Sequence, residues 1–157
     1  MRMVFAGALV LSLLPGTLWA GGDDWVPPVT DPLTLKECGE CHMAFQAGFL
    51  PARSWDKMMD TLDDHFGDNA SLPPESVAAI RAYLTANAGD TRPAGLSREF
   101  LSWVKPGGMP QRISENPEFV REHRRITPER LKQTQAMTLI NCPACHKRAA
   151  EGWYEDD

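Results

Sequence analysis

Apolar residues recur at helical spacing along most of the chain, in segments separated by breaks rich in proline and glycine. The clearest segment lies between Ser54, a natural N-cap, and Gly67, a natural stop. Its apolar stripe consists of Trp55, Met58, Met59, Leu62 and Phe66. No segment alternates apolar and polar positions with the period of two that is typical of a half-buried strand. The pattern therefore predicts an all-α fold.

The same signals predict four further helices. Four of the five helices begin at or next to a proline, which suits a first helical turn because the missing N–H has no partner to lose there. The expected helices span residues 33–47, 54–67, 73–88, 116–126 and 127–140. Phe119, His123 and Ile126 share one face of the helix at 116–126.

A polar, turn-rich stretch at residues 89–95 separates two halves, and we interpret it as a linker. We expect a first domain at residues 21–88 and a second at residues 96–157. Domains of about 60 to 70 residues rarely become stable through apolar burial alone, and disulfides, a metal or a bulky cofactor usually completes the core. Each half is therefore expected to enclose such a group.

Residues 1–20 have the features of an export signal peptide. Arg2 provides the positive start, residues 4–14 are apolar, and residues 18–20 form a small-residue cleavage site, so the mature chain is expected to begin near Gly21. The apolar run is shorter than the roughly 20 residues of a membrane-spanning helix, and charges or prolines interrupt every later stretch. We expect a soluble protein exported to the periplasm, with no membrane span after cleavage.

The mature chain is acidic. Removing Arg2 from the 16 basic residues leaves 15 against 21 acidic ones, a net charge of −6 with neutral histidines. Phosphate groups repel a chain of this sign at long range, which argues against nucleic acid and anionic lipid as partners. The expected partners are other proteins.

All four cysteines lie in two identical arrangements, Cys38-Gly39-Glu40-Cys41-His42 and Cys142-Pro143-Ala144-Cys145-His146. The pattern C-x-x-C-H is the attachment motif of haem c. Two intervening residues allow both sulfurs to reach the two vinyl groups of one porphyrin, and the next histidine then meets the iron from the same side. We expect two covalently attached haem c groups, with His42 and His146 as iron ligands.

Zinc and disulfide bonds are the alternatives for four cysteines. A zinc ribbon places its two C-x-x-C pairs about 15 to 20 residues apart, whereas 100 residues separate Cys41 from Cys142. Neither zinc nor disulfides explain why a histidine follows both pairs. An export signal agrees with haem attachment, because the thioether bonds form after translocation.

Two haems need four axial positions, and the chain has four histidines. Outside the motifs, His65 lies at the edge of the apolar stripe of the helix at 54–67, and His123 lies on the apolar face of the helix at 116–126. Both imidazoles can therefore point toward a buried ring, and we expect both to be distal ligands.

Methionine is the competing distal ligand, because a thioether also binds haem iron and raises its potential. Met58 and Met59 are the alternatives in the first half, and Met109 and Met137 are the alternatives in the second.

Three arginines, Arg121, Arg124 and Arg125, flank His123 in an otherwise acidic chain. They either form a solvated helix face, or pair with a haem propionate or dock an acidic partner. The pattern leaves both interpretations open, as it does for Trp153 and Tyr154, which either pack on the second haem or lie free near the acidic C-terminus.

Several of these segments resemble the bacterial dihaem cytochrome c family. They are residues 38–45 with Glu40, Leu50-Pro51, Ser54-Trp55, His65-Phe66-Gly67 followed by Ala70-Ser71-Leu72, and the motif at residues 142–146. The resemblance implies a two-domain electron-transfer protein whose first domain is similar to a class I cytochrome c and whose second has a different topology. It also implies histidine on both sides of each iron, with His65 and His123 as the distal ligands.

Two imidazoles on each iron leave no position open for oxygen, peroxide or nitrite, so we expect outer-sphere electron transfer rather than an enzyme. The expected partners are donor and acceptor cytochromes, a membrane cytochrome among the candidates. The alternative is a dihaem peroxidase-like enzyme or a gas-binding haem protein. Such a protein keeps one iron open, and a peroxidase also needs a proton donor beside it.

Overall fold

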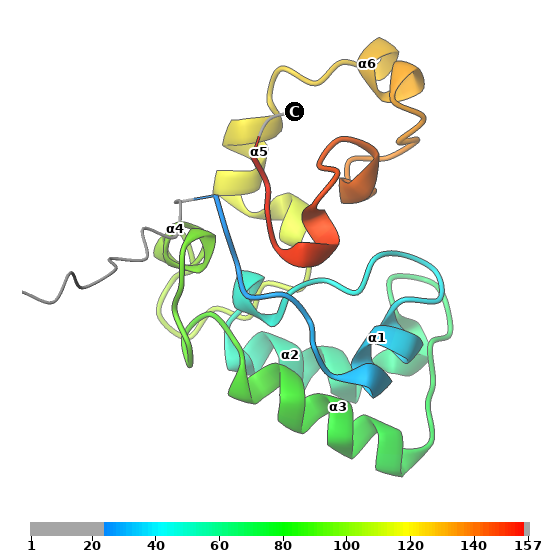
Figure 1. The fold of residues 1–157 in the computed structure, drawn as a ribbon. Helices are drawn as coiled ribbons and strands as arrows, with labels where there is room; N and C mark the ends of the chain where they lie inside the picture. Colours follow the sequence, from blue (N-terminus) through cyan, green and yellow to red (C-terminus); the bar gives the residue numbers. More distant parts are fainter. Residues whose placement is uncertain (1–23, 156–157) are drawn as a thin grey trace, which may run out of the picture.

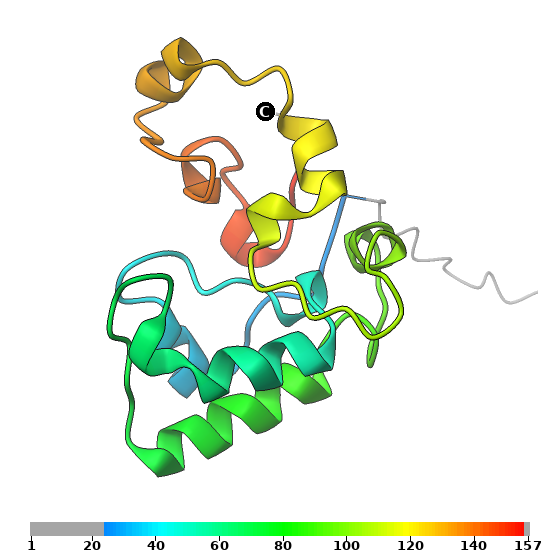
Figure 2. The same cartoon turned by 180° about the vertical axis from the view of Figure 1, so that it is seen from behind.

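The structure, a computed structural model, describes residues 24–155 as a helical fold (Figures 1 and 2). The α-helices in this range are α1 (Pro32–Cys38), α2 (Ala52–Asp60), α3 (Pro74–Ala86), α4 (Leu96–Ser102), α5 (Pro117–His123) and α6 (Pro128–Gln133). The short 3-10 helices are η1 (Ala47–Phe49), η2 (Leu62–Asp64), η3 (Ile113–Glu115), η4 (Cys142–Ala144) and η5 (Ala149–Glu151). Strand pairing in this part of the chain is limited to two isolated bridges. The predicted all-α class is confirmed.

The signal peptide expected at residues 1–20 lies outside the described residues and stays a prediction. Between residues 24 and 155, no helix is both long enough and apolar enough to span a bilayer.

Helices α2 and α3 pack side by side and form the core of the first half (Figure 1). Leu50 and Ile80 are fully buried there. Trp55 lies against them and donates a hydrogen bond from Nε1 to the carbonyl oxygen of Ala47, at 2.8 Å. The first part of the stripe predicted from the sequence thus supplies one wall of this core.

Helix α2 is shorter than the range of 54–67 expected for it, and its N-cap differs. Pro51 occupies the N-cap position, and Ser54 is buried inside the helix. The helix ends at Asp60, since Thr61 leaves helical geometry with a φ of −129° and a ψ of 34°, and its N–H donates to the carbonyl of Met58 at 3.2 Å. His65 consequently lies after η2 rather than on a helix.

The helix expected at 33–47 ends at Cys38. At Gly39 the chain turns so tightly that a Cβ atom would lie 2.2 Å from the carbonyl oxygen of Leu35. Only glycine fits there, and the rest of the first motif forms a turn.

The two helices expected at 116–126 and 127–140 are also shorter, ending at His123 and Gln133. Gln135 and Met137 have φ angles of 56° and 62°. A right-handed helix cannot contain such residues, so the chain leaves helical geometry before them.

Helix α4, within the second half, was not expected from the sequence. It is only seven residues long and begins after Gly95, whose φ is 45°. Its Phe100 packs on Phe49 with a centroid distance of 4.8 Å, in a cluster that also contains Val26 and Phe119. Tertiary contact therefore stabilises this helix more than its own sequence does.

Residues 24–26, near the start of the described chain, pair with residues 152–154 near its C-terminal end. The N–H of Val26 donates to the carbonyl of Gly152, and the N–H of Tyr154 donates to the carbonyl of Asp24, both at 2.9 Å. These contacts cross the domain boundary expected at residues 89–95, and the division into residues 21–88 and 96–157 stays a prediction. The segment at 24–30 ties the two ends of the fold together.

Replacing Gly152 with alanine is expected to loosen this tie. Gly152 has a φ of 88°, and a Cβ atom there would lie 1.9 Å from the carbonyl oxygen of Val26. The matched control is Gly107→Ala, because Gly107 has a φ of 73° with nothing within 4 Å of the added atom. The control variant should lose about 1 kcal/mol from the left-handed backbone alone, and Gly152→Ala should lose at least about 2 kcal/mol more in urea denaturation. Equal losses would mean that the tie contributes little.

Candidate functional site

The structure brings His42 and His65 together. His42 ends the first motif in the turn after α1, and His65 follows η2. Their ring centroids are 6.1 Å apart and their planes are inclined by only 21°. Burial lowers the pKa of His65, and the neighbouring His42 lowers it further. Both effects favour the neutral imidazole, which is the form that binds metals.

His123 and His146 form a second pair with the same spacing. His123 is the last residue of α5, and His146 follows η4. Their centroids are also 6.1 Å apart, but their planes are inclined by 76°. With a metal–nitrogen bond of about 2 Å on each side, a metal between two imidazole rings places the centroids about 6 Å apart. Both histidine pairs have this spacing.

Backbone carbonyl groups orient three of the four rings. The Nδ1 atoms of His42 and His123 lie 2.7 and 2.8 Å from the carbonyl oxygens of Met43 and Phe119. The Nδ1 atom of His146 lies 3.3 Å from the carbonyl oxygen of Glu155. A carbonyl oxygen only accepts, so Nδ1 carries the hydrogen and Nε2 keeps the lone pair that a metal needs.

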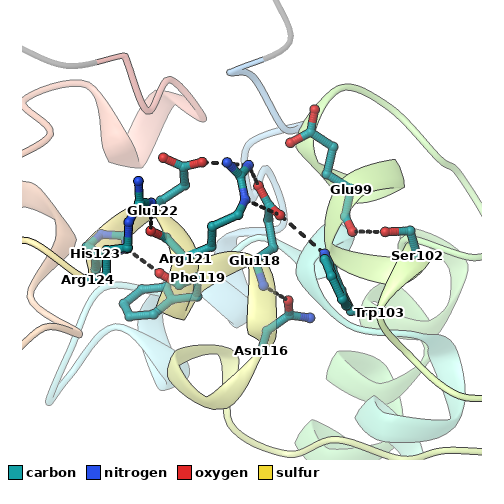
Figure 3. Close-up of polar contacts among 10 residues, drawn as sticks. All are labelled: Glu99, Ser102, Trp103, Asn116, Glu118, Phe119, Arg121, Glu122, His123 and Arg124. Atoms are coloured by element: carbon teal, nitrogen blue, oxygen red, sulfur yellow. Dashed lines mark hydrogen bonds and ion pairs between the residues drawn. The ribbon is translucent and has the colours of Figure 1, made fainter.

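A polar network around the buried side chains of Asn116 and Glu118 fixes the start of α5, the helix that carries His123 (Figure 3). The Asn116 side chain caps the helix by accepting from the N–H of Glu118 at 2.9 Å, as the sequence predicted. The Glu118 carboxylate accepts from Trp103 Nε1 at 3.2 Å and from Arg121 Nε at 3.1 Å. The ion pair with Arg121 lowers the pKa of this carboxyl group, and the Trp103 hydrogen bond contributes in the same direction.

This network answers part of the question about the arginines near His123. Arg121 is held by Glu118 and Glu122. No ion pair within residues 24–155 involves Arg124 or Arg125, and both side chains are exposed. Of the three, these two are therefore the ones whose charge is available at the surface.

A cavity of about 470 Å³ lies at the second histidine pair. Its lining includes His123, His146 and both cysteines of the second motif, together with the rings of Phe49 and Phe119. Cofactor sites are typically cavities of about 300 to 1,000 Å³ with mostly apolar walls and a few polar groups. The donor set and the walls fit a haem: the two thiols could attach it, the two imidazoles could bind its iron, and the apolar side chains could contact the porphyrin.

The environments of the first cysteine of each motif disfavour the thiolate form. Burial raises the pKa of Cys38 and of Cys142 to about 11. Zinc sites and redox-active dithiols need thiolates, which positive or metal-rich surroundings favour. All four cysteines lie in the described part of the chain, and no disulfide joins them there. In residues 24–155, no group of three or more potential metal-ligating side chains is close enough to hold a metal ion.

The methionines weighed as distal ligands lie elsewhere. Met59 is buried in the core of the first half, and Met58 packs against the same core. Met109 and Met137 are exposed, Met137 to 81%. The histidines, rather than the methionines, are thus the groups that face the motif histidines.

Sequence reasoning missed the aromatic neighbours of the histidines. Phe45 stacks on His42 at 4.9 Å, and Phe66 lies 4.8 Å from His65. Phe66 follows His65 directly, and Phe45 follows His42 by three residues, so adjacency along the chain was the available signal. Tyr154 lies 5.5 Å from His146, which agrees with the first of the two interpretations that the sequence left open for this residue.

Comparisons with known proteins agree with this geometry. The family model described as dihaem cytochrome c matches residues 34–154. The diheme cytochrome c from Rhodobacter sphaeroides is 43% identical, with a TM-score of 0.72 over 82% of this chain and 99% of that chain. A diheme cytochrome type c from Shewanella baltica OS155 is 33% identical, with a TM-score of 0.60 over 79% of this chain and 86% of that chain. Comparison with curated proteins gave no match.

Replacing Glu118 tests how much its buried carboxylate contributes to stability. Because its pKa is lowered in the folded state, its stabilisation is present above the unfolded pKa of about 4.3 and is lost as the pH falls through the folded pKa. Glu118→Gln should therefore cost about 1–2 kcal/mol at pH 7 and less in acid. Urea denaturation at several pH values measures this. Glu115→Gln, at an exposed surface pair with Arg112, is the control and should change little at any pH.

Proposed function

The chain belongs to the dihaem cytochrome c family, and on that premise we propose that it carries electrons between redox proteins in the periplasm by outer-sphere transfer. A protein of this family is a haem electron-transfer protein with two covalently attached haem c groups. The proposal concerns the compartment, the residues and the partners.

Each haem is bound by one motif and one distant histidine. Cys38 and Cys41 attach the first haem, and His42 and His65 bind its iron. The second haem has the same arrangement, with Cys142, Cys145, His146 and His123. The observation that carries this assignment is the 6.1 Å centroid spacing found in both histidine pairs.

The haem supplies reversible one-electron chemistry at its iron. The residues of the chain hold the imidazoles, exclude water and leave no axial position for a substrate. Phe45, Phe66, Phe119 and Tyr154 each pack against one of the four histidine rings. Ring packing of this kind holds the imidazoles in place, which suits electron transfer, whereas a dihaem peroxidase needs an open iron with a proton donor beside it.

The two haem sites differ in the charge around them, which supports different partners at each. Asp63, Asp64 and Asp68 are exposed on either side of His65. The exposed residues after His123 include the basic Arg124, Arg125, Arg130 and Lys132. A partner with a basic surface suits the first site, and a partner with an acidic surface suits the second.

Electron paramagnetic resonance of the oxidised, haem-loaded protein tests the assignment of the ligands. Nearly parallel imidazole planes split the iron d orbitals that face them, whereas nearly perpendicular planes leave those orbitals almost equal in energy. The angles of 21° and 76° therefore predict two different low-spin signals. One should be rhombic, and the other should be strongly anisotropic with a large maximum g value.

His65→Ala should abolish the rhombic signal alone, and His123→Ala should abolish the anisotropic signal alone. Each variant should also bind carbon monoxide at one reduced haem, because an axial position opens. The unchanged protein should bind none. A signal typical of histidine–methionine ligation, or stoichiometric carbon monoxide binding by the unchanged protein, would count against the proposal and favour the enzyme or gas-binding alternative.

Small redox reagents test the charge at the second site. The triple variant Arg125→Gln, Arg130→Gln and Lys132→Gln should slow oxidation of the reduced protein by anionic hexacyanoferrate about 3- to 10-fold at low ionic strength. High salt should remove the difference. The matched control neutralises Lys57, Arg92 and Arg98, which lie outside the segment that follows His123, and should slow the reaction less. Equal rates for both triple variants would show that the basic segment does not direct encounters.

A further inference from the structure

Gln46 is a fully buried amide whose two hydrogen bonds both reach the far end of the chain. Its Nε2 donates to the carbonyl oxygen of Ala149 at 2.7 Å, and its Oε1 accepts from the Tyr154 hydroxyl at 2.6 Å. The residue has no exposed surface. Burying an amide is costly unless its hydrogen bonds are made, so the native structure depends on keeping Tyr154 and Ala149 where they are.

Tyr154 is the residue that this amide holds, and it touches His146 directly. The two rings are 5.5 Å apart and inclined by 60°. The Tyr154 hydroxyl is part-buried and donates to the Gln46 amide oxygen. The Tyr154 ring also meets Phe49 edge-on at 5.3 Å, and its N–H is bonded to the carbonyl of Asp24.

The hydrogen bond of the His146 ring comes from the same short segment. Its Nδ1 donates to the carbonyl oxygen of Glu155, the residue after Tyr154. At 3.3 Å this bond is longer than the corresponding bonds of His42 and His123, which are 2.7 and 2.8 Å. His146 is therefore the least firmly held of these three rings by its own hydrogen bond, and its orientation depends more on what fixes residues 154 and 155.

We propose that Gln46 and Tyr154 are positioning residues for His146, so that a residue four positions after His42 sets the geometry of the second iron site. The inference rests on the proposed function, because it assigns His146 to the iron. It also means that the two haem sites are structurally coupled. The amide lies in the segment between the first motif and η1, and the ring that it holds lies at the second site.

Loss of this hold has a defined consequence. Without the hydrogen bond from the Tyr154 hydroxyl, the segment at 154–155 is freer, and the His146 ring can leave its angle of 76° to His123. The hydrogen bond that Nδ1 donates to the Glu155 carbonyl also weakens, which makes the imidazole a less electron-rich ligand. The second haem should then show a changed g tensor and a higher midpoint potential, and the first haem should show neither.

Tyr154→Phe is the principal test, because it removes one hydroxyl and keeps the ring. In the oxidised, haem-loaded protein, the anisotropic signal should shift, and the rhombic signal should stay in place. One of the two midpoint potentials should rise while the other is unchanged. Tyr154→Phe leaves the buried amide oxygen of Gln46 without its partner. The double variant Tyr154→Phe and Gln46→Leu also removes that oxygen, and it should give the same spectral shift.

Tyr83→Phe is the matched control. Tyr83, the other tyrosine of the chain, lies on α3. The variant removes its hydroxyl, which accepts from the N–H of Thr30 at 2.9 Å. It should leave both signals and both potentials unchanged.

Unchanged signals and potentials in Tyr154→Phe and in the double variant would overturn the inference. A loss of stability alone would not support it, because such a loss indicates a hydrogen bond with a merely structural role. This failure is distinct from failure of the proposed function. The latter would appear in the unchanged protein, as a ligand set other than two histidine pairs.

Discussion

The rest of this structure depends on one constraint, that two imidazole rings lie with their centroids 6.1 Å apart. Both histidine pairs satisfy this constraint, but different elements hold the rings in each pair. In the first pair, both rings lie in turns, after α1 and after η2. In the second pair, His123 sits at the end of a capped helix, and His146 is held through the C-terminal segment. The first arrangement gives nearly parallel planes and the second nearly perpendicular ones.

The two sites are not independent units joined by a flexible connection. Residues 24–30 pair with the C-terminal segment through Val26 and Gly152. Phe49, which follows the first motif, belongs to the cluster of Phe100 and Phe119 in the second half. A chain of this size gains stability by sharing core residues between halves that are each too small to bury much surface. Such sharing also means that a change near one histidine pair can reach the other.

Local patterns predicted much of this arrangement. The all-α class, helix α3 and the Asn116 cap were visible in the sequence, because apolar spacing and capping residues act over a few positions. The same holds for the pairing of His65 with His42 and of His123 with His146, since two motifs and two further histidines leave few combinations. Haem attachment was equally local, because five consecutive residues encode it.

Features that depend on distant contacts could not be predicted. Helix α4 is an example, because it is held by Phe100 packing on Phe49, a residue of the first half. Gln46 gave no signal at all, since a polar residue after a motif is ordinarily exposed, yet it is fully buried here. Its partners lie more than 100 residues away in the chain. Periodicity cannot reveal a contact of that kind.

The most direct test of the central claim is a crystal structure of the haem-loaded protein. The account predicts iron bound by Nε2 of His42 and His65 at one site, and by Nε2 of His123 and His146 at the other, with thioether bonds to the four cysteines. A methionine sulfur, a water molecule or an empty position at either iron would contradict it.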